Sequence, residues 1–282
     1  MLLTISACST QQRNYAYDSS PTQEFELGRT VNNIIYSPQD WPEQLQGDLY
    51  LPQREGLRPA VIMIHGGGWS GRSKVDMQST AEKISKQGYV VLNINYRFAP
   101  EYRYPSQLQD MQQALLWLSD NASRFRVDLS RINSWGYSSG AHLAALLASS
   151  SFREGLSLAQ QQRLPKIRSV IAGGIPADLS QYSGSPVIIP FLGQDRDENP
   201  ELYAQASPIN HISSDHPPVF LYHGKLDKLV EKEQSMNYYQ ALQENGIESD
   251  LYLHPWFGHF TMFLFGRDAE AKAIDFLNFH NA

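Results

Sequence analysis

The 282-residue sequence contains a single cysteine, Cys8, so no disulfide can form within the chain. A zinc site that needs several cysteines is excluded for the same reason. No stretch reaches the roughly 18 consecutive apolar residues that a membrane-spanning helix requires. The formal net charge is -6, and no long run of lysine and arginine indicates a nucleic-acid-binding surface. The composition is that of an ordinary globular protein, and nothing in it indicates a metal or an organic cofactor.

The one cysteine ends a short segment with a distinctive pattern. Ile5-Ser6-Ala7-Cys8 resembles the lipobox at which bacterial lipoproteins are cleaved and lipidated, and residues 9–22 are polar enough to form a tether. Only seven residues precede Cys8 and none is basic, whereas a secretory signal has a basic start and a longer apolar segment. The expectation is a start further upstream and a cell-envelope lipoprotein or periplasmic protein with a membrane tether at Cys8. The alternative is an accidental match in a cytoplasmic protein.

From residue 31 onward, strand patterns alternate with helix patterns. We expect strands at residues 31–36, 47–51, 60–64, 89–96, 131–135, 169–175, 219–222 and 250–254. We expect helices at residues 75–87, 107–125, 141–148, 231–245 and 267–279. This alternation predicts an α/β fold with a mostly parallel, doubly wound sheet that helices cover on both faces. Ligands then bind outside the carboxyl ends of the strands.

The motif Gly136-Tyr137-Ser138-Ser139-Gly140 joins the strand at 131–135 to the helix at 141–148. It has the G-x-S-x-G form of a nucleophile elbow, in which a sharp strand-to-helix turn exposes the serine hydroxyl. Glycine suits both ends of the motif because side chains there would clash where the helix approaches the strand. The pattern therefore predicts Ser138 as a nucleophile.

A second glycine-rich motif, His65-Gly66-Gly67-Gly68-Trp69, follows the apolar strand pattern at 60–64. It matches the HGGG loop that supplies oxyanion-hole amides in lipases and esterases. Such a loop lies at the same edge of a parallel sheet as the elbow. The two motifs together predict a serine hydrolase.

A serine nucleophile needs a histidine base and an acid that orients it, in the chain order serine, acid, histidine. His259 lies in a loop between the last strand and the last helix, where a base reaches over the sheet edge, and His254 is its main rival. Asp227 follows the strand at 219–222 and is our candidate acid. Asp178 is the rival acid, with a helix cap or a turn as its structural alternative.

These motifs give the chain a clear resemblance to α/β-hydrolases of the esterase and lipase group, close to the hormone-sensitive-lipase-like carboxylesterases. The matching segments are residues 65–69, 96–100, 136–143, 223–230 and 258–260, in the expected order. Relatives of hormone-sensitive lipase usually read G-D-S-A-G-G at the elbow, whereas this chain reads Gly-Tyr-Ser-Ser-Gly-Ala. The Gly-Ala-His-Leu-Ala ending is more similar to small esterases and arylformamidases.

The resemblance implies that the backbone N–H groups of Gly67, Gly68 and Ser139 form the oxyanion hole. Trp69, Tyr137 and Phe260 are candidate substrate-binding residues, although aromatic side chains belong to a core just as often. Residues 23–282 are then one catalytic domain, with a lid segment at 180–215 and a small cap. The expected function is hydrolysis of small to medium carboxylic esters through an acyl-enzyme. The alternatives are an arylformamidase or amidase with the same triad, and an inactive hydrolase fold that only binds a ligand.

Overall fold

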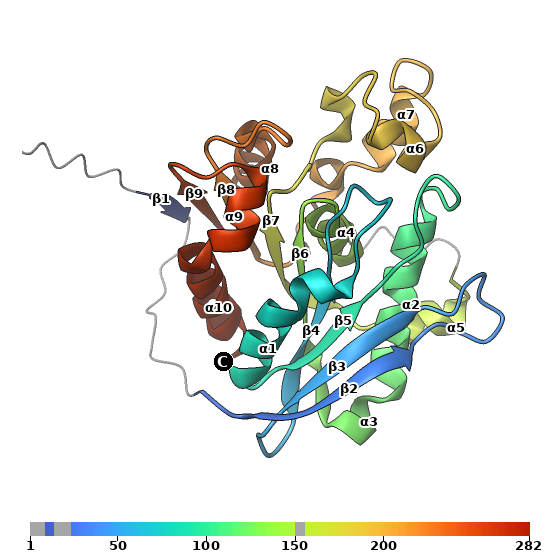
Figure 1. Cartoon of the computed structure of the whole chain (residues 1–282), viewed down its shortest axis with the longest axis vertical. Coiled ribbons are helices and arrows are strands. Elements are labelled where there is room, and N and C mark those ends of the chain that lie inside the picture. Colours follow the sequence, from blue (N-terminus) through green and yellow to red (C-terminus); the bar gives the residue numbers. More distant parts are fainter. Residues whose placement is uncertain (1–8, 14–23, 150–155) are drawn as a thin grey trace, which may run out of the picture.

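The computed structural model describes residues 9–13, 24–149 and 156–282, so Cys8 and most of the predicted tether lie outside the described residues. Nine described strands form one sheet in the order β1-β9-β8-β7-β6-β4-β5-β3-β2 (Figure 1). The strands are β1 Thr10–Arg13, β2 Leu27–Ile35, β3 Gln46–Pro52, β4 Arg58–Ile64, β5 Val90–Ile94, β6 Val127–Tyr137, β7 Ile167–Gly173, β8 Val219–Gly224 and β9 Ser249–His254. The six strands from β9 to β5 run parallel. At one edge β1 pairs antiparallel with β9, and at the other β3 pairs antiparallel with β5 and β2 pairs antiparallel with β3. The predicted α/β-hydrolase fold is confirmed.

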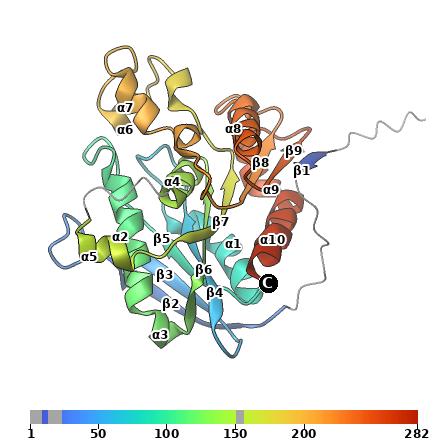
Figure 2. The same cartoon turned by 180° about the vertical axis from the view of Figure 1, so that it is seen from behind.

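Ten α-helices and three short 3₁₀ helices are described. The α-helices are α1 Gln78–Lys86, α2 Ser106–Asp120, α3 Ala122–Phe125, α4 Ser139–Ala148, α5 Leu158–Arg163, α6 Ile188–Leu192, α7 Pro200–Gln205, α8 Lys232–Glu244, α9 His259–Phe265 and α10 Arg267–Asn281. The 3₁₀ helices are η1 Lys74–Met77, η2 Leu179–Gln181 and η3 Pro208–His211. Helices α1 and α10 cover one face of the sheet, and α2, α4 and α8 cover the other (Figures 1 and 2).

The central strand β4 shows how the sequence builds two cores. Ile62 and Ile64 point into the core shared with α2, α4 and α8, whereas Val61 and Met63 point into the core shared with α1 and α10. All four side chains are fully buried. Alternate residues of a strand face opposite sides, so a strand covered by helices on both faces is apolar throughout. Burial on both faces therefore stabilises the sheet that positions the candidate site.

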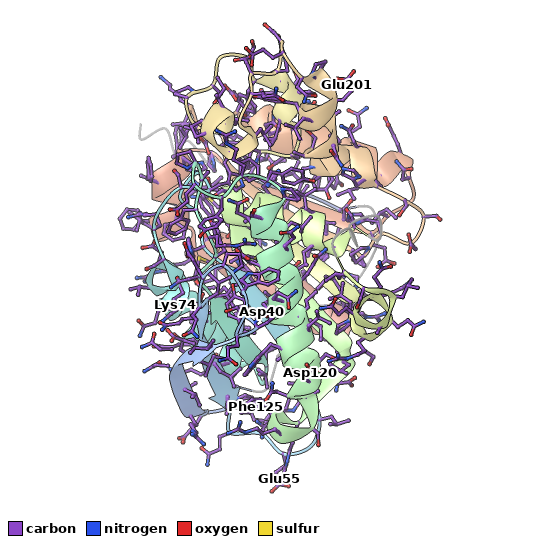
Figure 3. All side chains as sticks on the ribbon, turned by 90° about the vertical axis from the view of Figure 1, so that its right-hand side faces the viewer. Asp40, Glu55, Lys74, Asp120, Phe125 and Glu201 are labelled. Atoms are coloured by element: carbon purple, nitrogen blue, oxygen red, sulfur yellow. The ribbon has the colours of Figure 1, made fainter. Side chains whose placement is uncertain are left out.

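Several predicted elements differ in detail. The helix predicted at 107–125 divides into α2 and α3 at Asn121, whose side-chain amide donates to the Trp117 carbonyl. The helix predicted at 75–87 begins as the 3₁₀ helix η1. The lid segment predicted at 180–215, for which no helix is expected above, contains α6, α7 and η3. Glu201 of α7 lies at one end of the molecule and Glu55, between β3 and β4, at the other (Figure 3).

The largest difference concerns the predicted tether. Thr10–Arg13, within the segment expected to stay unpacked, pairs with β9 as the antiparallel edge strand β1, and Thr10 lies opposite Leu253. Arg13 also forms an ion pair with the buried carboxylate of Asp250, at 3.3 Å. The expectation rested on too few apolar residues, but backbone hydrogen bonds at a sheet edge do not require apolar side chains. Part of the segment therefore belongs to the folded domain.

Candidate active site

Ser138 lies at the sharp turn between β6 and α4. Its backbone has φ 56° and ψ -125°, a region that costs a residue with a side chain about 1–3 kcal/mol and recurs at functional sites. A Cβ on Gly136 would lie 2.2 Å from the Gly140 carbonyl, and a Cβ on Gly140 would lie 2.2 Å from the Ile64 oxygen. The two glycines are therefore required by the close approach of α4 to β6 and β4, as the sequence predicts.

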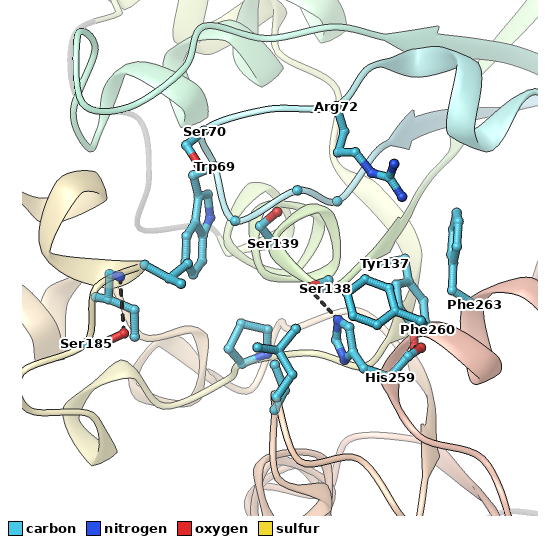
Figure 4. Close-up of a pocket in the computed structure, with 18 of the residues that line it drawn as sticks. Trp69, Ser70, Arg72, Tyr137, Ser138, Ser139, Ser185, His259, Phe260 and Phe263 are labelled. Carbon is cyan, nitrogen blue, oxygen red and sulfur yellow. Dashed lines mark hydrogen bonds between the residues drawn. The ribbon is translucent and has the colours of Figure 1, made fainter.

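The structure brings Ser138, His259 and Asp227 into one hydrogen-bonded chain at the carboxyl edge of the sheet. The Ser138 Oγ lies 2.9 Å from His259 Nε2 (Figure 4). His259 Nδ1 lies 2.6 Å from Asp227 Oδ2. They follow the ends of β6, β9 and β8, respectively. Because the carboxylate holds the proton on Nδ1, the lone pair of Nε2 faces the serine hydroxyl and can accept its proton.

A second layer of contacts holds the acid. The backbone N–H groups of Leu229 and Val230 donate to Asp227 Oδ1 at 2.9 and 3.0 Å. His223 Nε2 lies 3.1 Å from Asp227 Oδ2, and Ser235 Oγ lies 2.7 Å from His223 Nδ1. Burial raises the pKa of Asp227, but the hydrogen bonds from His223 and His259 outweigh it and hold that pKa well below its usual range. The carboxylate is therefore ionised beside His259.

The sequence alone did not reveal the supporting roles of two residues, His223 and Tyr137. His223 stands four residues before Asp227, in the segment 223–230 that contributes to the family resemblance. Tyr137 was predicted to bind substrate. Its ring lines the pocket, but it is 4% exposed and its hydroxyl donates to the backbone oxygen of His259 at 2.6 Å. Tyr137 therefore fixes the start of α9 as well as lining the pocket.

Gly67 and Gly68 border Ser138 from the loop after β4. Their φ angles are +121° and +61°. A Cβ on Gly67 would lie 2.3 Å from the Gly71 oxygen, and a Cβ on Gly68 would lie 2.9 Å from a methyl group of Val187. Among the described residues no acceptor takes the backbone N–H of either glycine. Ser139 opens α4, where the first N–H groups have no partner within the helix, so all three amides remain available at the pocket wall.

Buried aromatic side chains hold this glycine loop. His65 stacks on Tyr96, with ring centroids 4.4 Å apart, and its Nδ1 donates to the Gly66 oxygen at 2.7 Å. Trp69 stacks on Phe191 and donates from Nε1 to His142 Nδ1 at 3.3 Å. Burial lowers the pKa of His65 and of His142 to about 4, so both imidazoles are neutral. Trp69 lines the pocket but is 2% exposed, which makes it mainly a support of the loop.

A pocket of about 470 Å³ opens in front of Ser138 (Figure 4). Its walls are mostly apolar and include Phe260, the third predicted substrate-binding residue, which is 62% exposed. The lid segment contributes Tyr182 and Ser185–Ile188. Arg72 and Asp76, 3.2 Å apart as an ion pair, are the charged side chains among the described residues of the wall. The predicted lid therefore borders the pocket, through its first third.

The rival candidates have other partners. Asp178 caps η2, where its carboxylate accepts from the Ser180 N–H at 3.0 Å and from the Gln181 amide at 2.8 Å. His254 stacks on Phe257, with ring centroids 3.6 Å apart. Across the described ranges, no group of three or more histidine, cysteine or acidic side chains is arranged to hold a metal ion. In the same ranges no helix has the length and apolarity needed to cross a membrane.

The sheet and the site define an α/β-hydrolase fold with a serine–histidine–aspartate chain at the carboxyl edge of its sheet. A family model described as BD-FAE matches residues 47–242, well over half of the chain, and the chain belongs to this family. The probable carboxylic ester hydrolase LipM of Mycobacterium tuberculosis is 27% identical over 197 residues, which are 67% of this chain and 46% of LipM. Arylacetamide deacetylase of Bos taurus is 40% identical over 110 residues, which are 36% of this chain and 27% of that protein.

A truncated carbohydrate esterase from gut microbiota has the same fold, with a TM-score of 0.79 and 24% identity. The superposition covers 93% of this chain and 99% of that one. The predicted resemblance to α/β-hydrolase esterases is confirmed by these comparisons. The chain spans about half the length of the mycobacterial esterases that it matches.

Proposed function

We propose that the protein is a serine carboxylesterase that hydrolyses small carboxylic esters through an acyl-enzyme. The observation that carries the proposal is the unbroken chain from Ser138 through His259 to Asp227, at the floor of an apolar pocket. The names of curated relatives such as LipM and LipQ support the same activity.

In the first half-reaction Ser138 Oγ attacks the ester carbonyl carbon while its proton passes to His259 Nε2. The carbonyl oxygen takes the negative charge and accepts hydrogen bonds from the amides of Gly67, Gly68 and Ser139. One such donor typically contributes about 3 kcal/mol in the transition state. His259 then gives the proton to the departing alcohol, and the acyl group remains on Ser138.

In the second half-reaction a water molecule takes the place of the alcohol. His259 accepts a proton from the water as its oxygen attacks the acyl carbon, and the same amides stabilise the second oxyanion. The proton returns to Ser138 Oγ as the acid leaves. Asp227 stays ionised throughout and stabilises the imidazolium that forms in both halves.

A second candidate is hydrolysis of amides or aryl formamides with the same three residues. Two observations favour keeping it: the Gly140–Ala144 segment resembles arylformamidases, and one relative is named arylacetamide deacetylase. The test is a panel of p-nitrophenyl esters of increasing chain length beside N-formylkynurenine. Turnover of esters alone supports the first candidate, preferred turnover of the formamide supports the second, and no turnover would mean that the fold only binds its ligand.

We also propose that the protein is tethered to a membrane through a lipid on Cys8, which places it in the cell envelope. The support is the lipobox-like Ile5–Cys8 segment, which lies outside the described residues. One acyl chain anchors weakly, so stable attachment requires several chains on the same cysteine. Intact-mass spectrometry of the protein from its native cells, with Cys8→Ser as control, tests the proposal. An unmodified Cys8 in the cytoplasmic fraction would reject it.

A further inference from the structure

Large apolar side chains are exposed together at one place on the carboxyl edge of the sheet. Six of them, each 52–63% exposed, are Leu226, Leu229, Trp256, Phe260, Leu264 and Phe265. They come from the segment after β8 and from the β9–α9 region, which the Leu226 N–H joins by donating to the Phe257 oxygen at 2.9 Å. We call these six residues the apolar rim. Leu229 and Phe260 also line the pocket, so the rim borders its mouth.

Clusters of this kind are uncommon on soluble proteins, because exposed apolar surface gathered in one patch favours contact with another apolar surface. The remaining large apolar side chains that are exposed are scattered over the described chain: Ile35, Leu57, Val75, Leu129, Leu158, Val187, Met236 and Phe279. Leu57 lies in the connection that carries Glu55, at the end of the molecule opposite α7 (Figure 3). The rim is therefore a local feature of the active-site edge.

Strand β1 leads the N-terminal part of the chain to the same edge. Its first residue, Thr10, lies opposite Leu253, near the carboxyl end of β9 and three residues before Trp256. Lys225, which precedes Leu226 in the rim, donates to the Thr10 hydroxyl at 3.0 Å. Figures 1 and 2 both show β1 beside β9, with α9 at the same end. The start of β1 thus lies next to both segments of the rim.

We propose that the apolar rim rests on a lipid bilayer, with the mouth of the pocket facing the lipid headgroups. Trp256 in the loop between β9 and α9, with Phe260 and Phe265 on α9, suits the boundary between headgroups and acyl chains. In sequence, Cys8 lies two positions before Thr10, so a lipid on it would hold this edge of the sheet against the membrane. The surface is complete without that lipid, and esters dissolved in the membrane would reach Ser138 without crossing bulk water.

The charges around the rim predict which lipids bind. Lys225, Lys228 and Arg267 carry positive charge there, and Glu231 and Asp268 carry negative charge at neighbouring positions. Because both signs are present and nearly balance, attraction to anionic headgroups is weak and burial of apolar surface drives binding. Binding to zwitterionic phosphatidylcholine is therefore expected, with little dependence on salt.

The test uses the full chain with Cys8→Ser, so that no lipid anchor contributes. This protein is expected to co-sediment with phosphatidylcholine vesicles. Trp256 is the exposed one among the chain's five tryptophans, all of which are described. Brominated phosphatidylcholine should therefore quench its fluorescence. In Trp256→Phe that quenching should disappear while co-sedimentation remains.

Two matched double variants locate the contact. Leu264→Ser with Phe265→Ser should bind vesicles at least five-fold more weakly, whereas Leu57→Ser with Phe279→Ser should bind as the parent does. Hydrolysis of a soluble acetate ester should be unchanged in both, and Ser138→Ala should still bind vesicles, which separates this inference from the proposed esterase activity. The inference is overturned if the parent does not bind, if both double variants bind equally, or if the parent is a dimer that the Leu264/Phe265 variant dissociates.

Discussion

His223 and Asp227 make a second imidazole–carboxylate contact behind the one that orients the proposed base. His223 Nε2 lies 3.1 Å from Asp227 Oδ2, the oxygen that His259 Nδ1 approaches at 2.6 Å. Asp227 Oδ2 and the Val230 oxygen are both acceptors, so His223 Nε2 carries a proton, while Ser235 Oγ forms a hydrogen bond with His223 Nδ1 at 2.7 Å. That proton points at Asp227 Oδ2 and at the Val230 oxygen, 2.9 Å away. The acid is thus held from both sides by histidines.

Replacing His223 should weaken catalysis without preventing folding. In His223→Phe the carboxylate loses one charge-assisted donor, typically about 1.5–3 kcal/mol, so kcat should fall about 10- to 100-fold with little change in KM. His223→Gln keeps an N–H near the position of Nε2 and should recover most of the rate. Equal kcat values for the two variants at equal thermal stability would show that His223 does not position Asp227.

The assignment of the acid is tested by comparing two aspartates. Asp227→Asn should lower kcat about 10⁴-fold, because the amide favours the wrong tautomer of His259. Asp178→Asn only alters the cap of η2 and should change kcat little. Steady-state kinetics of both variants, with circular dichroism to check the fold, make the comparison. A larger effect at Asp178 would mean that Asp178, which follows β7, is the acid of the triad instead of Asp227.

Most residues of the candidate site could be predicted from local sequence patterns. Gly136 and Gly140 predicted the elbow because their spacing reflects a steric requirement between neighbouring segments. Ser138, Asp227 and His259 each follow a strand, and parallel strands bring their carboxyl ends to one edge of the sheet. Such features depend on the fold class alone, so one sequence is enough to locate them.

Features that depend on residues far apart in the sequence could not be predicted from local patterns. The polar Thr10–Arg13 segment becomes a strand only because β9, some 240 residues away, offers an unpaired edge. Helix α9 begins at His259 itself, and its apolar sequence through Phe265 has no polar face to suggest a surface helix. The contact of His223 with Asp227 could not be predicted from the sequence, since a buried histidine at the end of a strand usually has a packing role.

Stability should depend on pH through two buried histidines. Burial lowers the pKa of His65 and His142 to about 4, whereas an unfolded histidine titrates near 6.5. Between these values the unfolded chain binds more protons, so the free energy of unfolding decreases as pH falls through about 6.5 to 4, by about 3 kcal/mol per histidine. Urea unfolding across this range measures the effect. His142→Gln should flatten the dependence, and a parent protein with no pH dependence would contradict the argument.

The pocket should favour short acyl chains of about two to six carbons, because its volume of about 470 Å³ lies toward the lower end of the range for ligand-binding pockets. Val187 of the lid lies against Gly68 and narrows the space beside the oxyanion amides. Val187→Ala should therefore raise kcat/KM for longer esters relative to the acetate. A parent enzyme whose rates rise steadily through long-chain esters would refute the preference.

The central claim is that Ser138 is the nucleophile of a serine hydrolase. The most direct measurement combines a fluorophosphonate probe with ester hydrolysis in the parent protein and in Ser138→Ala. The parent should be labelled once per chain, and the substitution should abolish labelling and lower kcat about 10⁶-fold while leaving the fold intact, because no other group forms the covalent intermediate. Labelling that persists in Ser138→Ala, or a parent protein that neither reacts with the probe nor turns over any ester, would contradict the account.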